Sequence, residues 1–199
     1  MKTFVTSDQH FGHKNIIKLC DRPFRSVEEM DEVLMARWNE VVGPDDLVYH
    51  LGDFCYKAGK DPGHYRKKLN GSIILIRGNH DPKLSQQRWA DNGFSVVCVD
   101  HFIEESGRFV HLYHYPLRDW NGYYRNSYHL FGHSHGRTKG IGRSMDVGVD
   151  AGGNFYPYRL DALLDRLSAV DNPGISQEAR EGRPEGEIKP GIHKVGERA

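Results

Sequence analysis

Short apolar runs alternate along this chain with longer stretches in which apolar residues recur every three or four positions. The longest periodic stretch predicts a helix over 27–41, because it follows a capping box that begins at Ser26 and it stops at Gly43. The continuous apolar run 72–76 is typical of a central strand covered on both faces. The same patterns predict further strands over 3–6, 47–51, 94–99, 109–113, 128–131 and 145–149, and further helices over 84–90 and 160–167.

Polar clusters follow directly after five of the predicted strands. The alternation of strands and helices predicts an α/β fold, and in open α/β sheets ligand sites lie at the carboxyl ends of the strands. We therefore expect the five clusters to meet in space although they are far apart in the sequence. The clusters are Asp8-x-His10, Gly52-Asp53, Gly78-Asn79-His80-Asp81, His114 and Gly132-His133-x-His135.

These clusters share the chemistry of metal ligands, because borderline divalent metals accept carboxylate, imidazole and amide oxygen. An Asp-x-His or His-x-His pair at a strand end directs both side chains to one side, since residues two apart share a face. The glycines before Asp53, Asn79 and His133 allow the backbone to approach the site closely. Taken singly, each cluster is typical of a surface loop, a turn or a solvated strand edge. The ordered set of five indicates a site.

The ordered set resembles the motifs of the calcineurin-like metallophosphoesterase superfamily, and the small prokaryotic and phage-type members are the most similar. The resemblance covers residues 1 to about 165. It implies a four-layer α/β sandwich, in which two mixed β-sheets are flanked by helices and hold a two-metal site between the strand ends. It also implies metal-dependent hydrolysis of phosphate esters.

The resemblance assigns roles to the positions that match the motifs. Asp53 would bridge two metal ions, His80 would face the substrate, and Asp81 would orient His80. One position departs from the family pattern, because Tyr56 stands where a second acid is often found. That acid is not a metal ligand in the family, so the departure concerns the surroundings of the site. The first metal would be held by Asp8, His10, Asp53 and His135, and the second by Asp53, Asn79, His114 and His133.

The predicted site supports a hydrolytic mechanism on physical grounds. Two divalent ions about 3.5–4 Å apart clamp a phosphate and acidify a bridging water, so a metal-bridging hydroxide would attack phosphorus in line. Histidines bind as neutral ligands, which leaves about one net positive charge to attract an anionic ester. His80 would protonate the leaving alkoxide or stabilise equatorial charge. The ligands suit Mn²⁺, Fe²⁺, Co²⁺, Ni²⁺ or Zn²⁺ better than Ca²⁺ or Mg²⁺, and the resemblance favours Mn²⁺.

Composition narrows the class of substrate and the compartment. The 27 basic and 27 acidic residues balance, which argues against a chain that coats nucleic acid or an anionic membrane by bulk charge. No apolar run approaches the roughly 20 residues of a membrane span, and the first residues lack the apolar stretch of a secretion signal, so neither is expected. The three scattered cysteines are typical of reduced thiols in the cytosol. We therefore expect a cytoplasmic phosphodiesterase for small or nucleotide-like substrates.

Several alternatives share these residues. A phosphomonoesterase, or a nuclease or nucleotide pyrophosphatase, would use the same metal site, and a basic stripe with salt-sensitive binding would favour nucleic acid. A non-catalytic scaffold would be expected to have lost ligands or His80, and a structural metal site to be closed and mononuclear. The complete set disfavours both. The oligomeric state is not predicted.

Three residues outside the clusters are candidates for substrate binding. His13 and Asn15 lie just past two predicted ligands, and either would meet the substrate phosphate or cap the following helix. Arg118 follows His114 in a predicted loop, where it would grip a phosphate or simply pack. His129 lies inside a predicted strand and is expected to be structural.

Composition changes near residue 171, after which Gly, Pro, Glu, Lys and Arg dominate and aromatic residues are absent. We therefore predict a metallophosphoesterase domain over 1–170 and a flexible tail over 171–199. The alternative is an arm that docks on a partner or a second subunit, anchored by Ile175, Ile188 and Ile192.

Overall fold

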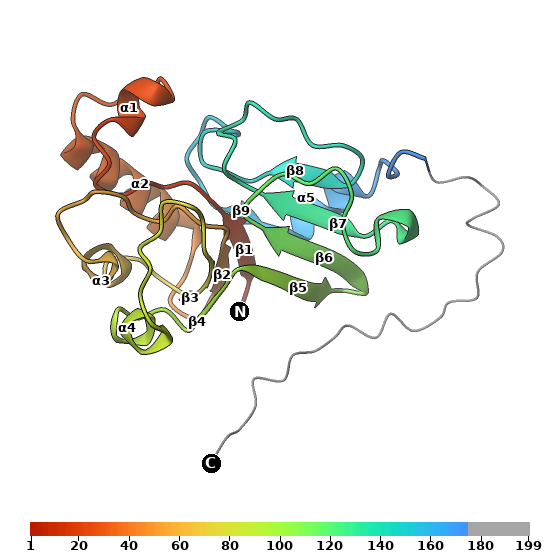
Figure 1. Ribbon diagram of the computed structural model, residues 1–199, viewed down its shortest axis with the longest axis horizontal. Coiled ribbons are helices and arrows are strands. Elements are labelled where there is room, and N and C mark those ends of the chain that lie inside the picture. The colour runs from red at the N-terminus through yellow and green to blue at the C-terminus, as the bar shows by residue number, and fades with distance from the viewer. Residues whose placement is uncertain (175–199) are drawn as a thin grey trace, which may run out of the picture.

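The computed structural model describes residues 1–174, without the side chains of residues 96 and 97, and contains two mixed β-sheets with helices (Figure 1). The predicted α/β class and the two-sheet architecture are confirmed. The first sheet has the order β4-β3-β2-β1-β9, with β1 Thr3–Thr6, β2 Leu47–His50, β3 Ser72–Ile76, β4 Val96–Cys98 and β9 Tyr158–Arg159. The second has the order β5-β6-β7-β8, with β5 Asp100–Glu105, β6 Arg108–Tyr113, β7 Tyr128–Phe131 and β8 Ser144–Asp146.

Parallel pairing brings many strand ends to one edge. Strands β1 to β4 are parallel to one another, as are β6, β7 and β8, while β9 and β5 run antiparallel to their neighbours. In Figure 1 the arrows of β6, β7 and β8 point toward the half of the molecule that carries α2. Beyond β1, Ser7 forms a parallel bridge with Gly148, which joins the two sheets. The polar residues that follow these strands therefore start from neighbouring positions.

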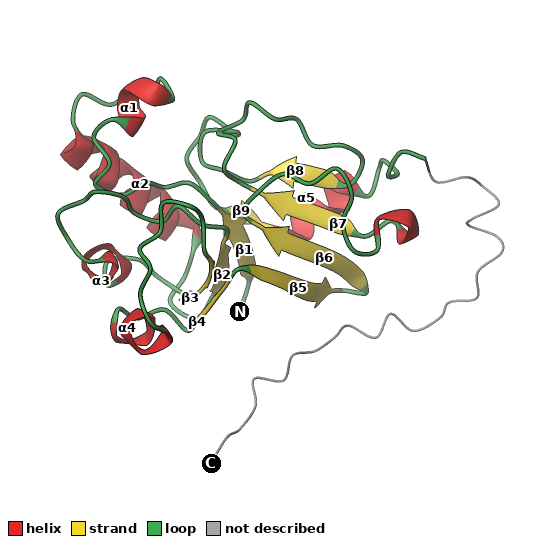
Figure 2. Ribbon diagram, viewed as in Figure 1, coloured by secondary structure: helices red, strands yellow, loops and turns green. Residues whose placement is uncertain are grey.

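Helices cover the outer face of the first sheet, as Figure 2 shows for α2 to α4. In α2 the buried residues Met30, Leu34 and Trp38 face the sheet, and Ser26 Oγ accepts the Glu29 amide as the capping box predicts. Among residues 1–174, no helix has the length and apolar character that crossing a membrane requires. The helices are α1 Ile16–Leu19, α2 Val27–Val41, α3 Pro62–Arg66, α4 Gln86–Asp91 and α5 Leu160–Leu167, with a 3₁₀ turn η1 at Tyr123–Arg125.

A second apolar core fills the space between the two sheets. Val5, Leu112 and Leu130 from both sheets meet Leu164 of α5 there, and all four are fully buried. The other face of the second sheet is covered by the segment 115–127, in which Trp120 packs on the ring of His129 at 5.2 Å. His129 is fully buried and its Nε2 accepts the Leu117 amide, so its expected structural role fits this contact.

The structure contains elements that were not predicted, namely α1, α3, β5, β9 and η1, and it differs from the prediction at the start of the tail. β5 was not predicted; it pairs with β6 through a hairpin in which Ser106 and Gly107 have φ of 53° and 73°. Asn172 is 1% exposed and donates to the carbonyls of Tyr123 and Ser127, so residues 171–174 pack on the domain rather than belong to a free tail. The rest of the predicted tail, with its candidate anchors Ile175, Ile188 and Ile192, lies outside the described residues.

Trp38 offers a test of the first core. Its side chain is 1% exposed, and its Nε1–H donates to the Asn70 carbonyl at 3.0 Å. We expect Trp38→Ala to lower the free energy of unfolding by about 3–5 kcal/mol, since it removes a large buried ring and leaves a cavity. Glu32→Ala on the exposed face of the same helix is the control, expected within about 0.5 kcal/mol of wild type. Chemical denaturation measures both, and an equal effect of the two would contradict this packing.

Candidate metal centre

Main-chain hydrogen bonds tie the polar clusters to one another. The amide of Asp8 donates to Gly52 O at 3.0 Å, and the amide of His10 donates to Asp53 O at 2.9 Å. Across the two sheets, the amide of His133 donates to Asp8 Oδ2 at 2.9 Å. The predicted convergence of the strand ends is therefore present in the structure.

The predicted ligands form two groups, which we call the first and second clusters. In each cluster one ligand atom from every residue lies within 4.8 Å of the others. The first cluster is Asp8, His10 and His135, and the second cluster is Asp53, His114 and His133. Asn79 belongs beside the second cluster, because its Oδ1 lies 3.0 Å from His114 Nε2 and 3.0 Å from His133 Nδ1.

Asp53 lies between the two clusters. Its Oδ2 is 3.3 Å from His10 Nε2 and 3.7 Å from His114 Nε2. Its Oδ1 accepts the main-chain amide of His80 at 2.9 Å, which holds the carboxylate in place. Oδ1 is thus hydrogen-bonded to the main chain, whereas Oδ2 faces imidazoles of both clusters.

The side chains fit divalent metal ions. Asp8 Oδ1, Asp53 Oδ2 and both ring nitrogens of His10 are buried without a hydrogen-bond partner among the described residues. His114 donates its Nδ1–H to the Leu51 carbonyl at 2.7 Å, so its Nε2 carries a lone pair and cannot donate to Asn79. Buried acceptors that point at one another are costly, and a cation supplies the missing partner. Carboxylate oxygens, imidazole nitrogens and amide oxygens together form a donor set that suits borderline metals.

Protonation states also suit metal binding. Burial lowers the pKa of His10 to about 4, so this imidazole is neutral at pH 7. Burial by itself would raise the pKa of Asp53, but the interactions with His10 and His114 outweigh it and bring this pKa to about 2. Burial raises the pKa of Asp8 well above its usual range, and the charge of Asp53 adds to this. Two carboxylates buried together require a counter-charge, and a metal ion provides one.

Strained backbone accompanies the ligands. Asp8, His10, Asp53, His133 and His135 all have positive φ, between 51° and 65°. This left-handed region costs a residue with a Cβ about 1–3 kcal/mol, and such residues concentrate at functional sites. Tight turns directly after the strand ends impose this conformation, and they direct the side chains inward.

All three predicted glycines are required for the close approach, and a Cβ on Gly52 would collide with the main chain of Gly78. A Cβ on Gly78 would collide with Asp53 Oδ1 and lie 2.7 Å from the His114 ring. A Cβ on Gly132 would collide with the hydroxyl of Ser7 and lie 2.6 Å from Asp8 Oδ2. Any larger residue at these positions displaces a predicted ligand.

His80 lies beside the first cluster, and Asp81 is buried in the loop that carries His80. The His80 ring is 5.4 Å from the His10 ring, and on its other side it contacts Tyr56, with 4.3 Å between ring centres. Asp81 accepts the main-chain amides of Asp53, Phe54 and Gly78, each at 2.8 Å. Asp81 therefore holds the main chain of the loop that carries His80. Burial raises the pKa of Asp81 to about 7, although these amides oppose the rise.

Comparison with known proteins agrees with this geometry. The family model described as calcineurin-like phosphoesterase matches residues 1–167. The chain belongs to the calcineurin-like phosphoesterase family. Membership implies a hydrolase that acts on phosphate esters and uses divalent metal ions, as the resemblance of the motifs indicated.

Individual relatives of this phosphoesterase span much of the chain. An uncharacterized protein of Methanocaldococcus jannaschii is 38% identical over 122 residues, which are 57% of this chain and 69% of the relative. The Gene 66 protein of Mycobacterium phage D29 is 26% identical over 200 residues, covering 84% of this chain and 96% of the relative. A solved structure of a protein of unknown function from Aquifex aeolicus matches with a TM-score of 0.67 and 25% identity, over 83% of this chain and 98% of that one.

Sequence reasoning missed a buried ion pair beside the metal centre of this phosphoesterase. Arg22 donates to both carboxylate oxygens of Asp150 at 2.8 Å, and it also donates to the carbonyls of Asp8 and Gln9. Asp150 in turn lies 2.7 Å from His135 Nδ1. The pair thus supports His135, a predicted ligand, and the loop that carries the other two residues of the first cluster. Asp150 directly follows a predicted strand, which was a usable signal, whereas nothing local marks Arg22.

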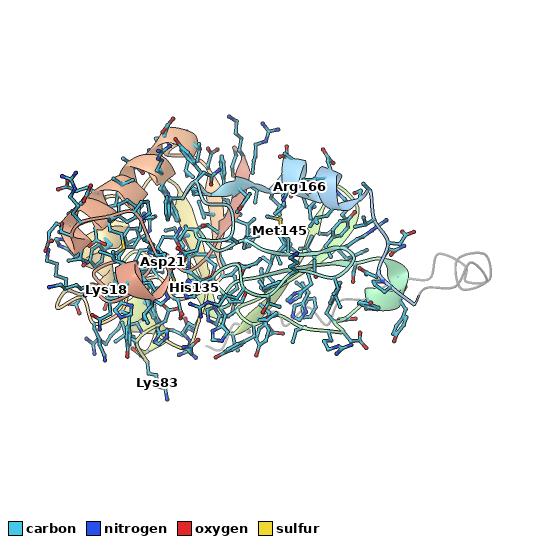
Figure 3. The ribbon with its side chains drawn as sticks, turned by 90° about the horizontal axis from the view of Figure 1, so that it is seen from above. Lys18, Asp21, Lys83, His135, Met145 and Arg166 are labelled. Atoms are coloured by element: carbon cyan, nitrogen blue, oxygen red, sulfur yellow. The ribbon has the colours of Figure 1, made fainter. Side chains whose placement is uncertain are left out.

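The surroundings of His135 set its charge. Burial by itself would lower the pKa of His135, but hydrogen bonds to Asp150 and Cys20 raise it to about 10. A metal at His135 therefore competes with a proton. With Nδ1 held by Asp150, Nε2 is the nitrogen available to a metal. Figure 3 shows His135 beside the segment that carries Lys18 and Asp21.

Asp150 provides a test of this support. We expect Asp150→Asn to weaken metal binding about 10–100-fold, because His135 loses the contact that orients its ring. The substitution also lowers the affinity of His135 for a proton, which favours the metal, but we expect this effect to be the smaller one. Competition with a fluorescent chelator at fixed pH measures the affinity. Asp165→Asn, on the exposed face of α5, is the control and should bind as wild type. Unchanged or tighter binding in Asp150→Asn would contradict the orienting role.

The three candidates for substrate binding have different positions. His13 is 9% exposed, its ring lies 5.4 Å from that of His10, and its Nδ1 has no hydrogen-bond partner among the described residues. Asn15 is exposed at the N-terminal end of α1, without a side-chain capping hydrogen bond. Arg118 is exposed on the segment that covers the second sheet. The structure therefore places His13 beside the predicted metal ligands. Asn15 and Arg118 make no hydrogen bond or ion pair with these ligands among the described residues.

Proposed function

We propose that this protein is a dinuclear metal-dependent phosphodiesterase. The observation that supports this most directly is the position of Asp53. One of its carboxylate oxygens lies within 3.7 Å of imidazole nitrogens from both clusters and has no hydrogen-bond partner among the described residues. A carboxylate oxygen in this position is suited to two cations at once.

The chain would hold the two ions with the residues that the motifs predict. When bound, the ions would supply Lewis acidity toward the phosphate and a nucleophile from water. Asp8 and Asp53 neutralise only part of the four positive charges, so the centre attracts an anionic ester. The first ion would take Asp8, His10, Asp53 and His135, and the second Asp53, Asn79, His114 and His133.

His80 is proposed as the proton donor to the leaving oxygen. Its main-chain amide is fixed by Asp53, and its loop is fixed by the three amide bonds of Asp81. The ring therefore faces the centre from a rigid position without being needed as a ligand. His13, whose ring lies 5.4 Å from that of His10, is proposed to contact a phosphate oxygen.

The substrate is proposed to be small or nucleotide-like. Lys plus Arg and Asp plus Glu are both 27, so the chain has no excess of positive charge to hold a long nucleic acid. The proposed metal is Mn²⁺, which suits this mixture of nitrogen and oxygen ligands.

Metal removal tests the proposal. Metal-stripped protein, reloaded with Mn²⁺, is assayed on bis-p-nitrophenyl phosphate and p-nitrophenyl phosphate in parallel. We expect turnover of the diester only after reloading, and its loss when a chelator is added. Preference for the monoester would contradict the diester assignment. Absence of turnover with every first-row metal, despite two bound ions, would contradict the assignment as an enzyme.

A further inference from the structure

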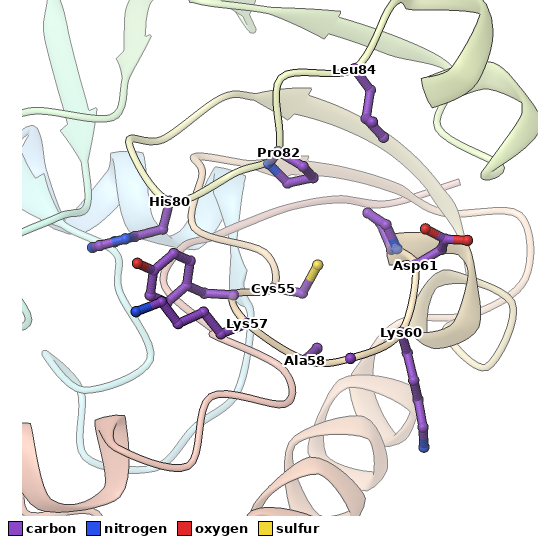
Figure 4. A pocket seen from close by; sticks show the side chains of 11 residues that line it. Cys55, Lys57, Ala58, Lys60, Asp61, His80, Pro82 and Leu84 are labelled. Carbon is purple, nitrogen blue, oxygen red and sulfur yellow. The ribbon is translucent and has the colours of Figure 1, made fainter.

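A cavity of about 610 Å³ lies beside His80, between the loop that follows β2 and the loop that follows β3. This volume is within the range of about 300–1,000 Å³ that is typical of small-molecule sites. Figure 4 shows His80 at one end of the cavity and Leu84 and Asp61 at the other. The cavity therefore begins at the proposed proton donor and leads away from the metal ligands.

The walls of the cavity are mainly apolar. Pro62 is buried, and Tyr56, Ala58, Pro82 and Leu84 are partly buried, so that each presents part of its surface. Figure 4 places Pro82 and Leu84 on one side and Ala58 on the opposite side. Proline and aromatic rings offer flat apolar surfaces, which suit a planar ring. A sugar or polyol would lose hydrogen bonds to water here without equivalent replacement.

Tyr56 is held firmly in this wall. Its ring lies 4.3 Å from the ring of His80 and 4.9 Å from that of His13. Its main-chain amide donates to the Phe11 carbonyl, and the Phe11 amide donates to Phe54 O at 3.0 Å. The cavity is thus formed before a ligand arrives, which reduces the entropy lost on binding.

Charge is placed at the rim rather than inside. Lys57 is exposed, with its Nζ 5.1 Å from the centre of the Tyr56 ring. Lys60 and Asp61 are exposed at the far side, and Figure 4 shows Lys60 pointing away from Pro82 and Leu84. A ligand would therefore meet an apolar interior and a cation near the His80 end, where a phosphate would lie.

We propose that this cavity is the subsite for a planar aromatic arm of the phosphoester, a group of the nucleoside class. The proposal rests on the proposed function for the place of the phosphate, which lies at the metal centre. The aromatic ring stacks on Tyr56 and packs against Pro82 and Leu84, and His80 faces the oxygen that joins the arm to phosphorus.

Equilibrium binding to the full Mn²⁺-loaded chain tests the subsite without turnover. The probes are adenosine 5′-monophosphate, ribose 5-phosphate and inorganic phosphate, measured by titration calorimetry. Wild type is expected to bind the nucleotide about tenfold or more tighter than ribose 5-phosphate, as one base–aromatic stack provides. Equal affinity for these two probes would overturn the proposal.

Two independent variants test whether the cavity causes the preference for the nucleotide over ribose 5-phosphate. Leu84→Trp fills the cavity and Tyr56→Ala removes the flat wall, so both should abolish the preference for the nucleotide over ribose 5-phosphate. Leu84→Trp should also leave the affinity for inorganic phosphate unchanged. Tyr56→Phe keeps the ring and should keep the preference. Lys83→Ala, at a side chain that Figure 3 shows projecting from the molecule, is the control. Retained preference in both Leu84→Trp and Tyr56→Ala, or an equal loss for all three probes, would overturn the proposal.

Failure of the subsite is distinguishable from failure of the proposed function. If the function is wrong and the subsite is right, the adenine preference persists although no metal-dependent turnover of the diester is seen. If the function is right and the subsite is wrong, the diester is turned over while adenosine 5′-monophosphate and ribose 5-phosphate bind equally.

Discussion

Asp53→Asn should abolish diester hydrolysis, with a loss of more than about 10⁴-fold, beyond what the loss of a proton donor costs. The substitution keeps the shape of the side chain, and the amide oxygen can still accept the main-chain amide of His80. It removes the one charged oxygen that lies between His10 and His114. We therefore expect fewer than two bound ions per chain, measured by elemental analysis together with the rate on bis-p-nitrophenyl phosphate.

Asp165→Asn is the matched control for Asp53→Asn. Asp165 lies on α5 with its side chain 74% exposed, and its ion pair with Arg108 is at the surface, where such pairs contribute little. This variant should keep both ions and the full rate. Two ions and normal turnover in Asp53→Asn would show that the carboxylate does not join the two clusters.

His80→Ala should lower turnover about 10²–10⁴-fold while both metal ions stay bound. The ring stands outside the two clusters, and the contact of this residue with Asp53 is made by its main-chain amide, which alanine retains. The result would thus separate proton transfer from metal binding. The measurements are metal content and the rate on bis-p-nitrophenyl phosphate.

Leaving-group dependence sharpens the test of His80. p-Nitrophenolate leaves without a proton, whereas an alkoxide requires one. The loss in His80→Ala should therefore be larger for a methyl or ethyl ester arm than for the p-nitrophenyl arm. His64→Ala on α3 serves as the control and should match wild type with both substrates. An equal loss for both leaving groups would assign His80 a role other than proton donor.

Elements with strong local signals agree closely between sequence and structure. The helix predicted over 27–41 is α2 Val27–Val41, and the strand predicted over 72–76 is β3 Ser72–Ile76. Capping, periodicity and a continuous apolar run act within a few residues, so the chain itself carries the information. β5 carried no such signal, because its sequence Asp-His-Phe-Ile-Glu-Glu has neither a long apolar run nor alternating apolar residues, and the strand forms by pairing with β6 at the edge of the sheet.

The candidate site likewise has features that the sequence predicts and features that only packing creates. The order of the motifs, together with parallel strands, was enough to predict that seven metal-ligand candidates meet. The pair of Arg22 and Asp150 spans 128 positions and exists only because two distant segments pack together. The cavity beside Tyr56 likewise depends on how the loops after β2 and β3 are placed, since neither loop encloses it alone.

Side-chain chemistry and local patterning do not depend on distant contacts, so the sequence alone was enough to predict the kinds of metal ligand, their order, and their location at the ends of strands. Packing was needed to establish that one oxygen of Asp53 lies between His10 and His114, that Asp150 contacts His135, and that five of the seven predicted ligands take a left-handed backbone. These features arise from packing between residues far apart in the chain. The stability of the whole fold, rather than of any local segment, offsets the backbone strain that they require.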